Sequence, residues 1–146
     1  MPTAGRLTAA VFFAVLAWYV TDLAMTVMPS AYDRPSVPKW NALIAFCASW
    51  SVFRKLDGTI RHGLVLGLTA ALLTTALITL CHSAALTFGA AWRGRTGSLL
   101  DTFESTFSTM GDIALFLLSS QETVIAAVVG ALAIGIVSAM MQRRFT

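Results

Sequence analysis

The sequence predicts an all-α integral membrane protein, in which about four transmembrane helices form one domain over residues 1–146. Hydrophobic residues make up 57% of the chain and charged residues only 12%, against about 25% charged residues in an average soluble domain. A soluble fold of this size could not cover its surface with so few charges. Long stretches also carry no charge, and crossing the hydrocarbon core of a bilayer as a helix takes about 20 apolar residues.

Four apolar segments are the predicted crossings. The first ends before Pro29, because proline cannot continue a helix. The second is the shortest, since its ~15 residues at 1.5 Å each cover only about 22 Å. The basic residues beside it must therefore reach out to the interface. In chain order, the four segments are residues 7–28, 39–53, 63–91 and 121–141.

Residues 98–118 differ from the four apolar segments, because their apolar and polar residues alternate at helical spacing. This pattern predicts an amphipathic helix before the last crossing. Acidic and hydroxyl side chains, Asp101, Ser105, Ser108 and Asp112, line one face. A helix that lies on a lipid surface would carry Lys and Arg there instead. We expect the apolar face to pack on protein or to lie at the rim of the bundle. That face consists of Leu99, Leu100, Phe103, Phe107, Met110, Ala114 and Leu117.

Basic residues in the loops predict the orientation, because cytoplasmic loops carry an excess of Lys and Arg. With the N-terminus inside, six basic residues fall on the cytoplasmic side and four on the outer side. We therefore expect both termini in the cytoplasm. The six are Arg6, Arg54, Lys55, Arg61, Arg143 and Arg144, and the four are Arg34, Lys39, Arg93 and Arg95.

Small residues recur at every fourth position in two of the predicted helices. In lipid, helices associate through close backbone contact, which small residues permit. Each stripe could serve packing inside the protein or docking to a partner protein. The first stripe is Gly63, Gly67, Ala71, Thr75, Thr79 and Ser83, and the second is Ala127, Ala131, Gly135 and Ala139.

Two ionisable residues, Asp22 and His82, fall within predicted crossings, where such groups are rare and mark functional sites by default. A mutual hydrogen bond inside the bundle would offset the cost of burying either one. We expect this polar pair. A role in moving a proton or substrate stays open, as does a role for His82 as the axial ligand of a tetrapyrrole. Cys47 and Cys81 are expected to be small buried apolar residues without a disulfide.

The chain carries no sequence signature of an enzyme. It lacks the spacing of a zinc protease, the nucleophile elbow of a hydrolase and a phosphate-binding loop. It also lacks a basic run with interleaved aromatic residues, which argues against nucleic-acid binding, so its net charge of +3 is assigned to loops that face anionic lipid. We predict no cofactor beyond bound lipid.

The N-terminal sequence resembles that of a known family. An apolar helix follows directly on the opening residues Met1, Pro2, Thr3, Ala4, Gly5, Arg6 and Leu7, and the second predicted helix carries Asn41, Ala42, Cys47, Trp50 and Val52. Together these residues resemble the TrgA-type tellurium-resistance membrane proteins of purple alphaproteobacteria. The resemblance implies a multi-pass protein of the bacterial inner membrane linked to tellurite tolerance, and it brings no catalytic residues.

Three functions are consistent with these observations. The first is a non-catalytic membrane protein that acts by packing its helices against partner proteins. The second is an accessory subunit of a larger complex, such as a photosynthetic reaction-centre–light-harvesting core or a respiratory complex. The third is an oxyanion or proton transporter, which is disfavoured because the predicted crossings hold no basic residue along a path.

Overall fold

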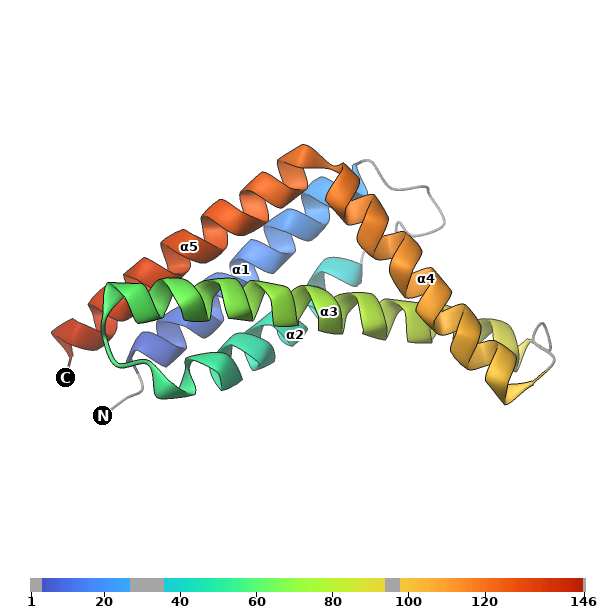
Figure 1. The fold of residues 1–146 in the computed structure, drawn as a ribbon, viewed down its shortest axis with the longest axis horizontal. Coiled ribbons are helices and arrows are strands. Elements are labelled where there is room, and N and C mark those ends of the chain that lie inside the picture. Colours follow the sequence, from blue (N-terminus) through green and yellow to red (C-terminus); the bar gives the residue numbers. More distant parts are fainter. Residues whose placement is uncertain (1–3, 27–35, 94–97, 146) are drawn as a thin grey trace.

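The computed structural model describes residues 4–26, 36–93 and 98–145 (Figure 1). Those residues form α-helices joined by short connections, with no strand, so the predicted all-α class is confirmed. Three helices, the first, third and fifth, are long and apolar enough to cross a membrane. The elements are α1 (Ala4–Met25), α2 (Val37–Val52), the 3-10 turn η1 (Phe53–Lys55), α3 (Ile60–Trp92), α4 (Leu99–Ser119) and α5 (Gln121–Arg144).

The helix bounds differ from the predicted ones by a few residues. Helix α1 starts three residues earlier and ends at Met25, three residues before the predicted end, while Pro29 lies outside the described residues. Helix α2 starts two residues earlier, because Pro38 is tolerated in the first turn of a helix. Helix α5 continues three residues further, to Arg144. Two arginines in its last turn stabilise this end, because cations interact favourably with the negative end of the helix dipole.

The short helix α2 runs antiparallel to α1 and returns the chain to the end where it began (Figure 1). Its 16 residues cover about 24 Å. The turn η1 adds three residues, or about 6 Å. Together they approach the ~30 Å of a hydrocarbon core.

Helix α1 packs against α2 and α5, and α3 packs against α5. The two predicted stripes of small residues meet at this last interface. A Cβ on Gly67 would overlap the carbonyl oxygen of Ala131, and one on Gly135 would overlap the carbonyl oxygen of Gly63. The stripes therefore pack on each other at these residues, which is the internal role, one of the two roles that the sequence left open.

The strict four-residue spacing does not hold along the whole of α3. Four residues turn a helix by about 400°, so each step drifts about 40° around its surface. Ala71 is consequently only half-buried and Thr75 is exposed. The buried face continues at Ala70 and Thr74 instead.

In its first half, α4 packs on α3 through hydroxyl residues, whereas the predicted apolar face is exposed there and half-buried only from Met110 onward. Its buried residues are Thr102 and Thr106, and the hydroxyl groups of Thr106 and Thr87 on α3 lie 2.6 Å apart. Phe103 and Phe107 are exposed. This arrangement suits a lipid environment, where apolar side chains gain little from facing another helix and small hydroxyl residues allow close contact.

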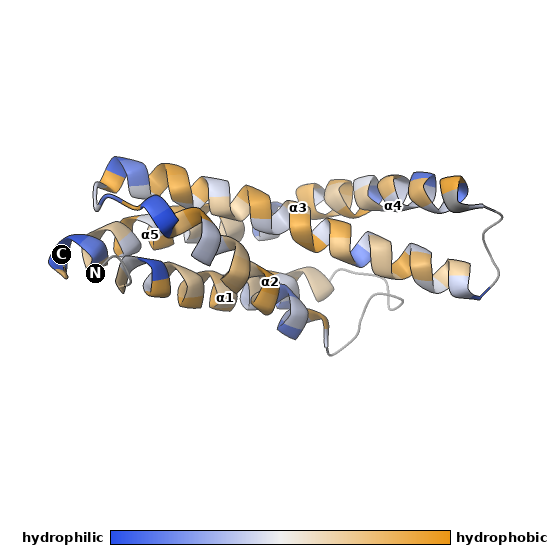
Figure 2. Ribbon diagram, turned by 90° about the horizontal axis from the view of Figure 1, so that it is seen from below, coloured by the Kyte–Doolittle hydropathy of each residue, from blue (hydrophilic) through white to orange (hydrophobic). Residues whose placement is uncertain are grey.

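One end of the molecule is basic, and we call it the basic end. There the amide of Gly5 donates a hydrogen bond to the Oε1 of Gln142, 3.3 Å away, which joins the start of α1 to the end of α5. A Cβ on Gly58 would lie 3.6 Å from the Cα of Arg143. Figure 2 shows hydrophilic residues gathered at this end, which carries both termini and the start of α3. It holds Arg6, Arg54, Lys55, Arg61, Arg143 and Arg144.

At the other end, α3 continues past α1 and α2, and α4 folds back along it toward α5 (Figure 1). We call residues 83–93 of α3 and 98–110 of α4 the α3–α4 arm. Its apolar side chains are strongly exposed: Trp92 is 94% exposed, Leu100 81% and Phe107 65%.

Candidate functional site

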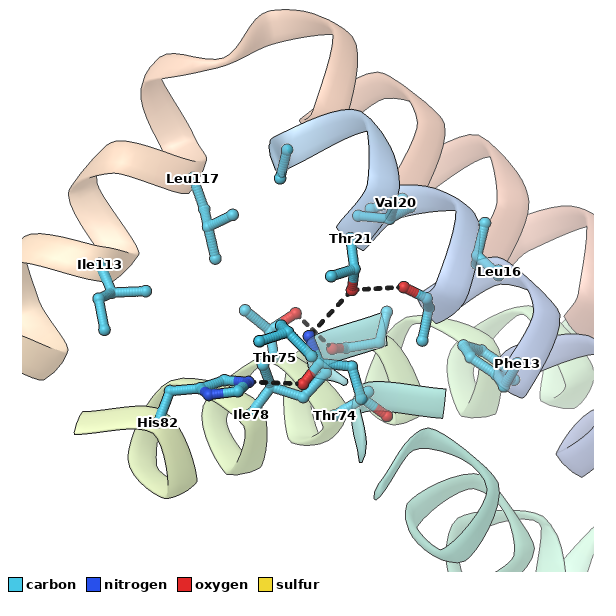
Figure 3. A pocket seen from close by; sticks show the side chains of 16 residues that line it. Phe13, Leu16, Val20, Thr21, Thr74, Thr75, Ile78, His82, Ile113 and Leu117 are labelled. Atoms are coloured by element: carbon cyan, nitrogen blue, oxygen red, sulfur yellow. Dashed lines mark hydrogen bonds between the residues drawn. The ribbon is translucent and has the colours of Figure 1, made fainter. Parts of the chain in front are cut away.

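A chain of hydrogen bonds links three helices in the middle of the molecule (Figure 3). The Nε2 of His82 on α3 lies 2.7 Å from the Oδ1 of Asn41 on α2. The Nδ2 of Asn41 donates to the Oγ1 of Thr21 on α1 at 2.9 Å. The hydroxyl of Thr21 donates in turn to the carbonyl oxygen of Ala17 at 2.6 Å. The chain therefore ties α1, α2 and α3 together.

The direction of each hydrogen bond follows from the last one. Thr21 has a single hydroxyl hydrogen, which it gives to Ala17, so the group of Asn41 that faces it must be the NH2 donor. The amide oxygen of Asn41 then faces His82 and must accept, which places a hydrogen on Nε2 of the ring. In the neutral ring, Nδ1 is an acceptor. One amide hydrogen of Asn41 keeps no acceptor among the described residues.

This polar chain borders a cavity of about 130 Å³. Apolar side chains from α1 form one wall, and Ile113 and Leu117 reach in from α4 on the other side (Figure 3). Helix α4 thus closes a space that the other helices leave open. Thr21, Asn41, Thr74, Thr75 and His82 supply the polar part of an otherwise apolar lining.

Thr74 is the unusual residue of this lining. Its Oγ1 is buried and has no hydrogen-bond partner in the part of the chain that the structure describes. Other threonines of α3, such as Thr75 and Thr79, donate to the carbonyl oxygen four residues before them. A buried hydroxyl without a partner costs about 1–3 kcal/mol. Because Oγ1 is fully covered, Thr74 lines the cavity with its other atoms.

The predicted pair of Asp22 and His82 is wrong. Asp22 is exposed on α1, and its neighbours there, Trp18 and Tyr19, are also exposed. Because α1 ends at Met25, Asp22 lies three residues from the helix end, or about 4.5 Å along the axis. The carboxylate can therefore reach the interface without a partner in the bundle.

His82 is half-buried and its Nε2 is engaged by Asn41. A tetrapyrrole metal bound through this nitrogen would have to displace Asn41. The geometry favours the structural role of His82 over the ligand role. Within the described ranges, no three His, Cys, Asp or Glu side chains gather where they could hold a metal ion.

Cys47 and Cys81 are free thiols, as expected, but both are exposed instead of buried. They line the same groove between α2 and α3, together with Leu43 and Leu77.

The basic end holds a second set of contacts. The guanidinium of Arg6 lies 4.5 Å from the centre of the Trp50 ring, and its Nε and Nη2 donate to the carbonyl oxygen of Trp50 at 3.3 and 3.1 Å. Trp50 lies near the end of α2, where carbonyl oxygens lack helix partners. Arg6 thus caps α2 from α1.

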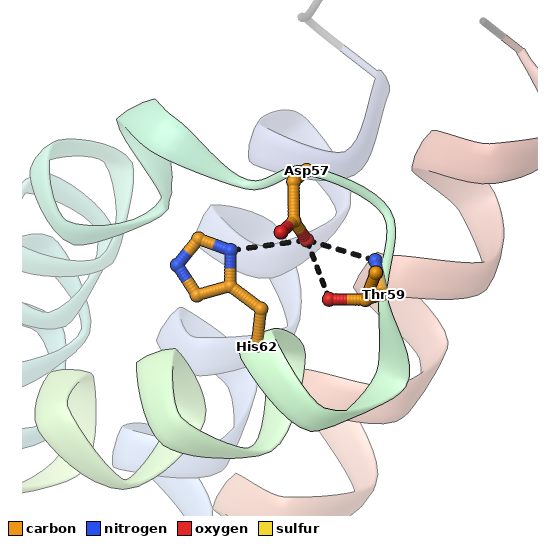
Figure 4. A network of polar contacts seen from close by, with 3 residues as sticks. All are labelled: Asp57, Thr59 and His62. Carbon is orange, nitrogen blue, oxygen red and sulfur yellow. Dashed lines mark hydrogen bonds and ion pairs between the residues drawn. The ribbon is translucent and has the colours of Figure 1, made fainter.

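Asp57 organises the turn before α3 (Figure 4). Its Oδ1 accepts from the amide of Thr59 at 2.9 Å and from the hydroxyl of Thr59 at 2.7 Å, and the Nδ1 of His62 lies 3.0 Å away. The backbone hydrogen bond from Thr59, followed by its hydroxyl and by His62, lowers the pKa of Asp57 to about 2. This carboxylate holds the start of α3.

Sequence reasoning identified His82 but missed its partner Asn41, the next residue of the polar chain, Thr21, and the cavity-lining Thr74. Asn41 could have been found, since an amide in an apolar helix needs a partner for the same reason as an ionisable group. Thr74 could not, because threonines in helices usually bond to their own backbone.

Comparison with known protein families, with curated proteins and with solved structures finds no match for this chain.

Proposed function

We propose that this chain is a non-catalytic, multi-pass membrane subunit that binds a partner membrane protein through the α3–α4 arm. The observation that supports it is the length of α3. Its 33 residues extend about 50 Å, whereas a hydrocarbon core is about 30 Å thick. A helix tilted by the average of about 20° crosses with roughly 21 residues, which leaves about 12 residues outside.

The residues of α3 that extend beyond the hydrocarbon core belong to the α3–α4 arm. The start of α3 carries Arg61 and His62 and lies at the basic end, so the interface falls there. The surplus residues are then those near Trp92, together with the part of α4 that packs on them. Apolar side chains that leave the hydrocarbon need another cover. A partner protein supplies it more naturally than water does.

The arm also carries charge that fits a partner. Asp101 and Glu104 are exposed on α4 beside the exposed Phe103 and Phe107. An apolar strip flanked by acidic groups matches a membrane protein whose surface has basic residues at the same depth. Anionic lipid would repel the same acidic groups.

The topology that we propose has four crossings, with α2 and η1 as the short second one. Helices α1 and α3 point the same way, which requires the chain between them to cross back (Figure 1). The six cations of the basic end then lie in the cytoplasm, as the excess of basic residues there favours. The resemblance to the tellurium-resistance family favours the bacterial inner membrane.

A photo-crosslinking residue in place of Phe103 tests the proposal in cells. We expect a crosslink to one membrane protein, and we expect Phe103→Gln with Phe107→Gln to move the native complex to a smaller size. The matched control is Leu72, which is 74% exposed on the middle of α3 and should crosslink to lipid alone. Crosslinks from position 103 to lipid alone would place the arm in the bilayer and reject the proposal.

The family resemblance makes tellurite tolerance the cellular phenotype to follow. A deletion strain that carries the Phe103 and Phe107 double variant should lose tolerance at normal protein levels if the partner complex supports it. Photosynthetic and respiratory complexes are the first partners to examine by identifying the crosslinked protein.

A further inference from the structure

We propose that a hollow formed by Trp18, Tyr19 and Asp22 on α1 and Ala42 on α2 binds the head group of a phosphatidylethanolamine molecule. The carboxylate of Asp22 would accept hydrogen bonds from the ammonium group of this lipid, and the two aromatic rings would lie beside its positive charge. The lipid belongs to the leaflet opposite the basic end. The proposal does not depend on the α3–α4 arm or on a partner protein.

Helix α1 brings the three side chains to one face. Trp18 and Tyr19 precede Asp22 by four and three residues, and side chains at these spacings are neighbours on a helix surface. All three are exposed, and all three line one open hollow of about 320 Å³. The small residues Ala14 and Ala42 line it as well, so no large side chain fills the space.

The polar chain holds the α2 wall of this hollow in place. Asn41 on α2 donates to Thr21 on α1 at 2.9 Å. The next residue of each helix, Ala42 and Asp22, lines the hollow. The hydrogen bond therefore fixes a small residue of α2 at the level of the carboxylate and leaves room there for a head group.

Asp22 faces lipid without a cation among the described residues. The ion pair recorded there joins Asp57 and His62 at the other end of the molecule. An ionised group at membrane depth is costly unless it finds a partner. Asp22 lies about 4.5 Å from the end of α1, and the head-group layer on each side of the hydrocarbon core is about 5–7 Å thick. A lipid head group is therefore a charge that the carboxylate can reach.

The groups of the hollow select among head groups. An anionic head group would be repelled by the carboxylate. A primary ammonium has three N–H donors for the carboxylate oxygens, whereas the trimethylammonium group of phosphatidylcholine has none. Both cations are attracted to the faces of tryptophan and tyrosine rings. The hydrogen bonds to Asp22 therefore favour ethanolamine over choline.

Fluorine resonances of the tryptophans test the assignment at this one place. The full-length protein is labelled with 5-fluorotryptophan and placed in nanodiscs of phosphatidylcholine, in which rising fractions are replaced by phosphatidylethanolamine with the same acyl chains. Net lipid charge stays constant. Trp18 reports on the hollow, and the exposed Trp40, which lines a different groove on α2, is the internal reference.

We expect the Trp18 resonance to saturate at a low fraction of phosphatidylethanolamine. The curve should correspond to a preference of about 3- to 10-fold over phosphatidylcholine, as one net hydrogen bond predicts. The Trp40 resonance should change in proportion to the bulk lipid composition.

Three variants assign that preference to one carboxylate. Asp22→Leu should make the Trp18 curve proportional to bulk composition, with a preference of about 1, and Asp22→Glu should keep most of the wild-type preference. The control is Glu122→Leu, because Glu122 is an exposed carboxylate in the first turn of α5 and does not line the hollow. This variant should behave like the wild type. An unchanged Trp40 resonance shows that each variant keeps the fold.

Each remaining outcome overturns the proposal. Equal preference of the wild type for the two lipids would mean that Asp22 accepts no hydrogen bond from the head group. A preference that survives in Asp22→Leu would assign it to another group, and one that is lost in Glu122→Leu would assign it to general surface charge. A Trp18 resonance that never moves would leave Asp22 to a basic side chain of another protein.

Discussion

Replacing Gly67 with alanine should weaken the contact between α3 and α5. A Cβ at this position overlaps the carbonyl oxygen of Ala131. A flexible side chain could move aside, but the oxygen belongs to the backbone of a packed helix. The two helices must therefore separate along the whole stripe, which includes the fully buried Ala131 and Ala139.

The size of the effect follows from two opposing contributions. Overpacking a well-packed interface costs about 1–3 kcal/mol. Alanine recovers up to about 1 kcal/mol, because glycine is the poorer helix former. We expect a net loss of about 1–2 kcal/mol, which lowers the ratio of folded to unfolded protein by roughly 5- to 30-fold.

The matched control is Gly111→Ala on α4. A Cβ there meets no atom within 4 Å, so only the gain in helix propensity remains. This variant should be more stable than the wild type by about 0.5–1 kcal/mol. Reversible unfolding by sodium dodecyl sulfate in mixed micelles, followed by circular dichroism, measures both variants on one scale.

The two glycine variants are therefore expected to shift the unfolding midpoint in opposite directions. If Gly67→Ala unfolds at the same detergent fraction as the wild type, or later, the close contact of the two helices is wrong. The same result would reopen the interpretation that the stripe on α3 faces a partner.

Three other variants address contacts away from this interface. The charged form of Asp57 stabilises the fold above about pH 4, and this contribution is lost as the pH falls through the folded pKa of about 2. Asp57→Asn should remove that pH dependence from acid unfolding curves. Asn41→Leu leaves the Nε2 of His82 unpaired and removes one of the two hydrogen bonds of the Thr21 hydroxyl, and it should cost about 0.6–2 kcal/mol in the same micelle assay. No loss would mean that the polar chain does not hold the helices. Arg6→Lys keeps the charge but loses the two-nitrogen contact to the carbonyl of Trp50, and it should cost about 0.5–1.5 kcal/mol with a change in tryptophan fluorescence.

The sequence predicts the helices well because their signals are local. Uncharged length alone identifies α3 and α5, and the small-residue spacing identifies the faces through which they meet. Asp57 and Gly58, which are typical turn residues, lie between α2 and α3, and Gly58 has a φ of +81°, which favours glycine. Each of these features needs only neighbouring residues to be interpreted.

The environment of α4 could not be predicted in this way, and Asn41 could be predicted to need a partner but not to find it in His82. A rule that holds in water predicts that the apolar face of α4 packs on protein, whereas Thr102 and Thr106 are the buried residues of its first half. The choice between Asp22 and Asn41 as the partner of His82 depends on where α1 ends and how it is turned toward α2. Both are tertiary facts that no short pattern encodes.

The hydrogen bond between Gly5 and Gln142 joins residues 137 positions apart. During synthesis at about 5–20 residues per second, the ribosome takes roughly 6–24 s to go from the end of α1 to the end of α5. For that interval α1 has only α2 beside it, and its α5-facing surface meets lipid or an insertion factor. Assembly therefore finishes with the C-terminal helix, and a nascent chain stalled before α5 would present an unclosed bundle to membrane quality control.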